Sequence, residues 1–147
     1  MSGYSDFFTE EEHKAISTAI RSAEKRTSGE IRVHLEDQCD HLPEDRAAYV
    51  FDKLEMHRTK DRNAVLFYLA VDDHRFAVVG DSGINDRVGG AFWKSLCLGM
   101  EARFRQGEFL IGLTEGIQKV GEHLSQQFPY HGEDVNELDD EVSTGLL

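Results

Sequence analysis

Four polar residues, Glu30, Asp61, Asn63 and Asp81, are the strongest candidates for a functional site in this sequence of 147 residues. Each carries a side-chain oxygen, and the three acids are negatively charged at neutral pH. Oxygen ligands suit the hard cations Ca²⁺ and Mg²⁺ better than Zn²⁺. If the side chains converge, repulsion between the carboxylates favours a bound divalent cation. In the alternative interpretation, each acid separately caps a turn or points into water.

An apolar run at residues 64–71 determines whether these residues can meet. Its length and its lack of alternation are typical of a strand buried on both faces of a sheet. The polar connection at residues 72–75 is short enough for a hairpin, so residues 76–79 are predicted to pair antiparallel with the run. Because the first strand of a hairpin starts at the edge where the second one ends, Asp61 is expected near Asp81.

Apolar and polar residues alternate in segment 30–35, which predicts a strand with one buried face. Residues 43–54 follow with an amphipathic helical pattern that begins at a proline. A strand–helix–strand crossover normally makes its two strands parallel, so the strand at 64–71 begins at the same edge as the strand at 30–35. Glu30 is therefore expected to join Asn63 and the two aspartates at that edge.

Three further helices are predicted from capping signals and from apolar residues at helical spacing. The first follows Thr9, which forms a capping box with Glu12, and ends near Gly29. The others cover residues 93–104 and 110–124, where large apolar side chains repeat every three or four positions. Together with the strands, these helices predict an α/β fold in which a mixed sheet has helices on both faces.

The composition narrows the class of protein. The net charge of −12 argues against nucleic acid as a partner, because the long-range field of the protein repels polyanions. No apolar run is long enough for a membrane-spanning helix. The N-terminus lacks the basic and apolar regions of a signal peptide, which predicts a soluble, cytoplasmic protein. Cys39 and Cys97 are expected to be free thiols.

Residues 1–130 are predicted to form a single domain, and residues 131–147 an acidic C-terminal tail. The tail is rich in Glu and Asp and has no periodicity, so it is expected to be loose. Val135 and Leu138 offer apolar side chains through which it could dock locally.

Four segments of the chain, taken in order, resemble the TPM domain, a family that includes a thylakoid-lumen phosphatase active in photosystem II repair. They are Thr-Ser-Gly-Glu-Ile-Arg-Val at 27–33, Arg-Asn-Ala-Val-Leu at 62–66, Val-Gly-Asp-Ser-Gly-Ile-Asn at 79–85, and residues 104–113. The resemblance extends over residues 8–129. It implies a three-layer α/β/α sandwich with a small mixed sheet, a divalent-cation site and, for some members, acid phosphatase activity.

The acidic site of the family carries over best onto Asp61 and Asp81, with Glu30 and Asn63 as neighbours. The sequence departs from the family in two respects. Many members have a signal peptide and a C-terminal membrane anchor, which this sequence does not show. Glu108 stands where the family usually has an aspartate.

Two functions remain open. In the first, this TPM-like domain is a binding or regulatory module whose acidic edge holds Ca²⁺ or Mg²⁺. In the second, it is a metal-assisted acid phosphatase acting on phosphomonoesters, in which Asp61 and Asp81 hold the metal and Arg62 steadies the phosphoryl charge. The sequence has no nucleophile motif and no second set of metal ligands, which favours binding. The membrane anchors of the family also imply a membrane-associated protein partner.

Overall fold

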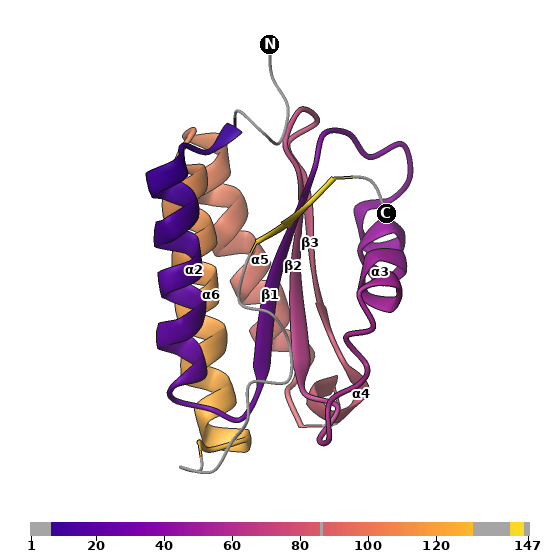
Figure 1. The fold of residues 1–147 in the computed structure, drawn as a ribbon, viewed down its shortest axis with the longest axis vertical. Coiled ribbons are helices and arrows are strands. Elements are labelled where there is room, and N and C mark those ends of the chain that lie inside the picture. The colour runs from indigo at the N-terminus through magenta and orange to yellow at the C-terminus, as the bar shows by residue number, and fades with distance from the viewer. Residues whose placement is uncertain (1–6, 86, 131–141, 146–147) are drawn as a thin grey trace.

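The computed structural model describes residues 7–85, 87–130 and 142–145 of the chain (Figure 1). The helices and strands of these residues are, in order, α2 (Glu10–Glu24), β1 (Glu30–Glu36), α3 (Pro43–Lys53), β2 (Ala64–Ala70), β3 (Arg75–Gly80), α4 (Ser82–Asn85), α5 (Gly90–Arg105), α6 (Phe109–Gln127) and β4 (Ser143–Thr144). Within the described residues the strands form one sheet in the order β3-β2-β1-β4. β1 is parallel to β2 and to β4, whereas β3 is antiparallel to β2, so the sheet is mixed as predicted.

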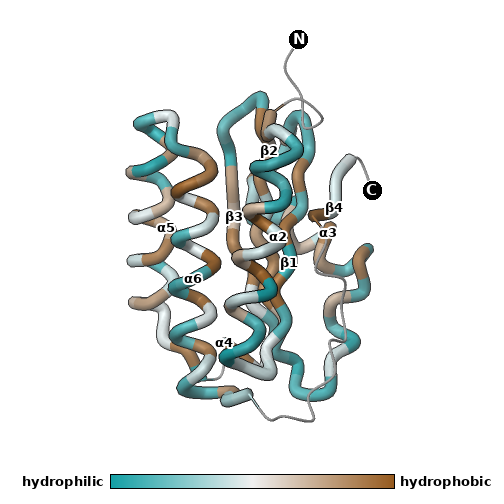
Figure 2. The backbone as a smooth tube through the Cα atoms, turned by 60° about the vertical axis from the view of Figure 1, so that its left-hand side comes forward, coloured by the Kyte–Doolittle hydropathy of each residue, from teal (hydrophilic) through white to brown (hydrophobic). Residues whose placement is uncertain are grey.

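Helices cover both faces of this sheet, which confirms the predicted three-layer α/β/α sandwich. Figure 1 shows α2, α5 and α6 on one side of the strands and α3 on the other. Apolar and polar stretches alternate along α5 and α6 (Figure 2), as expected for helices that place one face against a sheet. In the described ranges, no helix has both the length and the apolar character needed to cross a membrane.

Strand β2 lies between β1 and β3, and all seven of its residues are buried. Val65 and Phe67 belong to the core beneath the three-helix layer, whereas Leu66 and Tyr68 belong to the core beneath α3. Successive side chains of β2 thus enter two separate cores, because the side chains of a strand alternate between its faces. This confirms that the uninterrupted apolar run is a strand buried on both faces.

The helix starts agree well with the capping signals. The Thr9 hydroxyl accepts a hydrogen bond from the Glu12 N–H at 3.1 Å, and the Glu12 carboxylate accepts one from the Thr9 N–H at 2.9 Å. α3 begins at Pro43, as predicted. α5 begins at Gly90, earlier than the predicted start at residue 93. The prediction counted only from Trp93, the first residue of the apolar repeat, whereas the first turn of the helix precedes it.

The C-terminal region differs from the predicted loose tail in its last described residues. Ser143 and Thr144 form β4, which pairs in parallel with His34 and Leu35 of β1. The sequence does not indicate this strand, because two residues are too few to show a periodicity. Val135 and Leu138 lie outside the described residues, so their docking stays a prediction.

Candidate functional site

The starts of β1 and β2 and the end of β3 meet at one edge of the sheet, which we call the α4 edge. The Glu30 N–H donates a hydrogen bond to the Asn63 carbonyl at 3.2 Å, and the Asp81 N–H donates one to the Ala64 carbonyl at 3.0 Å. Glu30, Asn63 and Asp81 therefore lie at the same edge, as the predicted topology requires. All three are buried, with exposed fractions of 3%, 1% and 6%.

The side chain of Arg62 neutralises the Asp81 carboxylate. The Arg62 guanidinium donates two hydrogen bonds to its carboxylate, from Nε to Oδ2 at 2.8 Å and from a terminal nitrogen to Oδ1 at 2.9 Å. The Ser82 N–H also donates to Oδ1, at 2.6 Å. The hydrogen bond and the charge of Asp81 raise the pKa of Arg62. Arg62 therefore supplies the neutralisation that the sequence argument assigned to a bound metal.

The backbone of Arg62 is held in an unusual conformation beside α4. Its φ of 51° lies in the left-handed region, which is uncommon for residues other than glycine. The Gly83 N–H donates a hydrogen bond to the Arg62 carbonyl at 2.9 Å. A Cβ atom on Gly83 would lie 2.2 Å from the Asp61 carbonyl oxygen and 2.6 Å from that of Arg62. The absence of a side chain at this position lets the loop that carries Arg62 pack directly on α4.

Asp61 occupies a different environment from the other two acids. Asp61 is exposed, whereas Glu30 and Asp81 are buried. In the part of the chain that the structure describes, no group of three or more His, Cys, Asp or Glu side chains is arranged to hold a metal ion. The topology thus brings the backbones of the predicted residues to one edge without collecting their carboxylates into one group.

Asn63 is the least satisfied of the four predicted residues. Its side-chain Nδ2 donates a hydrogen bond to the Ser28 hydroxyl at 3.3 Å. Its Oδ1 atom is buried and has no hydrogen-bond partner among the described residues. Leaving a buried acceptor unpaired costs about 1–3 kcal/mol. The side chain of Asn63 therefore has one acceptor that the described residues leave unsatisfied.

A surface pocket of about 370 Å³ opens beside Asp81 on the side of the sheet that faces α3. The polar residues that line it are Asp52, His57, Arg62 and Asp81. The sequence argument did not include Asp52 and His57, because they come from α3 and from the connection after it. The local concentration of basic residues between Lys53 and Arg62 was the signal that could have pointed to this pocket.

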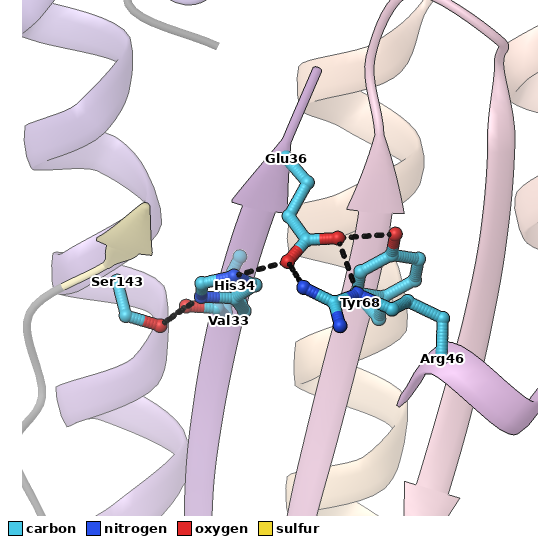
Figure 3. Close-up of polar contacts among 6 residues, drawn as sticks. All are labelled: Val33, His34, Glu36, Arg46, Tyr68 and Ser143. Carbon is cyan, nitrogen blue, oxygen red and sulfur yellow. Dashed lines mark hydrogen bonds and ion pairs between the residues drawn. The ribbon is translucent and has the colours of Figure 1, made fainter. Parts of the chain in front are cut away.

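A second polar cluster lies in the core beneath α3 (Figure 3). Arg46 donates two hydrogen bonds to the Glu36 carboxylate, at 2.8 Å and 2.5 Å, and the Tyr68 hydroxyl donates a third at 2.7 Å. The Nε2 atom of His34 lies 3.3 Å from the same carboxylate. Burial alone would raise the pKa of Glu36, but the hydrogen bonds from Arg46 and Tyr68 outweigh it and lower that pKa. Glu36 is therefore a buried, ionised carboxylate.

The imidazole of His34 makes the stability of the fold depend on pH. Burial lowers its pKa below the ordinary 6.5, and the nearby Glu36 opposes this only in part. Because the unfolded chain then binds a proton more readily than the folded chain, the free energy of unfolding should be highest above pH 6.5 and should fall as the pH drops below that value. Urea midpoints measured across this range should fall less steeply for His34→Gln. The exposed His41→Gln is the control, and equal slopes for the two variants would contradict the assignment to His34.

The comparisons agree with this architecture. The chain matches the TPM domain over residues 1–123. It is similar to the solved structure of the BA42 protein from the psychrophilic bacterium Bizionia argentinensis, with 48% identity, a TM-score of 0.91, and coverage of 99% of this chain and 100% of that one. No curated protein matches the chain.

Two more distant structures share the fold alone. The N-terminal domain of cg2496 from Corynebacterium glutamicum is 13% identical, with a TM-score of 0.65 and coverage of 98% of this chain and 83% of that one. The N-terminal domain of a protein from P. gingivalis is 19% identical, with a TM-score of 0.71 and coverage of 88% and 85%. Since the family match spans most of the sequence and agrees with the segments singled out above, the chain belongs to the TPM domain family.

Proposed function

We propose that this TPM domain binds a divalent cation, Ca²⁺ or Mg²⁺, at the α4 edge and serves as a binding or regulatory module. The observation that carries the proposal is the buried Asp81 carboxylate, which lines the pocket at the α4 edge together with Asp52. Glu30 and Asn63 are buried at the same edge. The exposed Asp61 offers a further carboxylate from the adjoining loop. All of these donors are oxygens, which is the ligand set that Ca²⁺ and Mg²⁺ prefer.

Arg62 would act as the internal competitor of the cation. Its guanidinium pairs with Asp81, yet its side chain is half exposed, whereas that of Asp81 is only 5% exposed. Arg62 can therefore move into water when a cation takes its place on the carboxylate. Binding would release the loop that carries Arg62 and so change the surface beside α4, which is a simple means of regulation.

Millimolar Ca²⁺ or Mg²⁺ is expected to raise the melting temperature. A ligand that binds only the folded state stabilises it by about 2.7 kcal/mol at 100 times its Kd. Asp81→Asn should abolish this shift, because it weakens a ligand. Arg62→Gln should enlarge the shift, because it removes the competing charge. Asp40→Asn is the matched control: this exposed acid follows β1 at the opposite end of the sheet, and its loss should change nothing.

Calorimetric titration with each metal ion alone gives the Kd and completes this test. A melting curve that no divalent cation moves would contradict the proposal. So would a shift that Asp40→Asn removes and Asp81→Asn retains, because it would place the cation at the other end of the sheet.

A second candidate function, metal-assisted acid phosphatase activity on phosphomonoesters, is favoured by the pocket beside Asp81. Arg62 lines this pocket with a guanidinium that suits a phosphoryl group, and His57 adds a group for proton transfer. Hydrolysis of p-nitrophenyl phosphate at acid and neutral pH tests this function. Arg62→Gln separates the two candidates, because it should strengthen cation binding but abolish turnover. A membrane-associated protein partner, which the anchors of the family imply, stays a prediction.

A further inference from the structure

Strand β4 lies along the outer edge of β1 and pairs with only part of it. β4 pairs with only His34 and Leu35 of the seven-residue strand β1. The Gly145 N–H donates a hydrogen bond to the Leu35 carbonyl at 2.9 Å. The backbone of Gly145 has a φ of 90°, a conformation that glycine adopts more easily than other residues. Val142 packs against the core beneath the three-helix layer. The described C-terminal residues therefore contact the fold through a short ladder, through the side chains of Val142 and Ser143, and through the Gly145 backbone beside His34.

Ser143 reaches the buried polar cluster (Figure 3). Its Oγ atom lies 2.7 Å from the Nδ1 atom of His34 and 3.2 Å from the Val33 carbonyl oxygen. His34 is fully buried, and its other nitrogen faces Glu36. Glu36 is itself fixed by Arg46 and Tyr68, which belong to α3 and β2. The imidazole that receives Ser143 is thus positioned on its Nε2 side by groups that do not depend on β4.

The hydrogen-bonding groups of this cluster determine which side chain the outer edge of β1 can accept opposite His34. The Glu36 carboxylate can only accept hydrogen bonds, so the Nε2 atom of a neutral His34 must carry the proton. The Nδ1 atom faces β4 and is paired with the Ser143 hydroxyl, which also donates a hydrogen bond to the Val33 carbonyl at 3.2 Å. An alanine in place of Ser143 would remove both the contact with the buried Nδ1 atom and the hydrogen bond to the Val33 carbonyl. Serine and threonine are the short side chains that place a hydroxyl group at this position of a strand.

We propose that the outer edge of β1 is a strand-recognition site that selects an extended segment with a serine or threonine opposite His34, and that the C-terminal segment at residues 142–145 is its exchangeable occupant. A second copy of this segment, supplied in trans, is the partner that fits the site. Strand addition of this kind takes affinity from the backbone ladder and specificity from alternate side chains. Val142 and Ser143 provide those two side chains, one to each face of the sheet.

The test uses the full chain with Ser143→Ala, which weakens the tethered occupant. A fluorescent peptide with the sequence Val-Ser-Thr-Gly-Leu-Leu should bind this variant about tenfold more tightly than Val-Ala-Thr-Gly-Leu-Leu, as measured by anisotropy. Val-Ser-Ala-Gly-Leu-Leu is the matched control peptide. It should bind like the first peptide, because Thr144 is exposed. Equal binding of all three peptides, or none at millimolar concentration to a folded variant, would overturn the proposal.

Hydrogen exchange on the unaltered chain keeps the proposal testable if the variant does not fold. The Gly145 amide, which donates to Leu35, should exchange at least about tenfold faster than the amides of β2, because an exchangeable strand opens without global unfolding. Equal protection of Gly145 and of Leu66 would show that β4 opens only when the whole fold does, and would overturn the proposal.

Discussion

Replacing Arg46 by alanine is expected to lower the free energy of unfolding by about 3–5 kcal/mol. Arg46 provides two of the hydrogen bonds to Glu36, and the side chain of Glu36 is only 2% exposed. Removing one partner of a buried ion pair leaves the other charge without compensation in a medium of low polarity. Urea unfolding at neutral pH, followed by circular dichroism, measures the loss.

Arg58→Ala is the matched control for this variant. Arg58 pairs with Glu55 at 3.0 Å, but both side chains are more than half exposed. A surface pair of this kind contributes about 0–1 kcal/mol, because water screens both charges. The double variant Arg46→Met with Glu36→Gln should recover part of the loss, since no charge then remains buried. If Arg46→Ala and Arg58→Ala lower the free energy of unfolding by the same amount, the buried polar cluster stabilises the fold no more than a surface ion pair does.

Gly83→Ala is expected to lower the free energy of unfolding by about 3 kcal/mol, which is the upper end of the usual cost of overpacking. The new Cβ would meet the backbone carbonyl oxygens of Asp61 and Arg62 at 2.2 Å and 2.6 Å, distances that require the chain itself to move. Flexible side chains could relieve such a contact cheaply, but two backbone segments cannot. The loop must therefore separate from α4, and thermal and urea unfolding should both show the loss.

This substitution also probes the candidate cation site. Displacing the loop moves Arg62 away from Asp81, so any cation response should change together with stability. Gly90→Ala is the control, because a Cβ at that helix position meets nothing within 4 Å and alanine favours the helix. Equal free energies of unfolding for Gly83→Ala and Gly90→Ala would contradict the close packing of the loop against α4.

The sequence by itself determined the arrangement of the strands, because apolar periodicity and chain connectivity are local properties. The run at 64–71 has no polar face, so it had to be a strand covered on both sides. A short polar connection then allowed only a hairpin, and the helix at 43–54 made the preceding strand parallel. These rules were sufficient to bring Glu30, Asn63 and Asp81 to one edge.

Only the tertiary structure decided which charges meet, because partners come from segments whose side-chain directions no local pattern specifies. Arg62 is one of several basic residues in a polar stretch, yet a left-handed backbone turns it onto Asp81. The alternation in segment 30–35 indicated a more polar face, but α3 covers that face and buries Glu36 with Arg46. β4 has no periodic signal, because two residues are too few to show one. Its position depends on the ladder with β1, on the packing of Val142 and on the contact between Ser143 and His34.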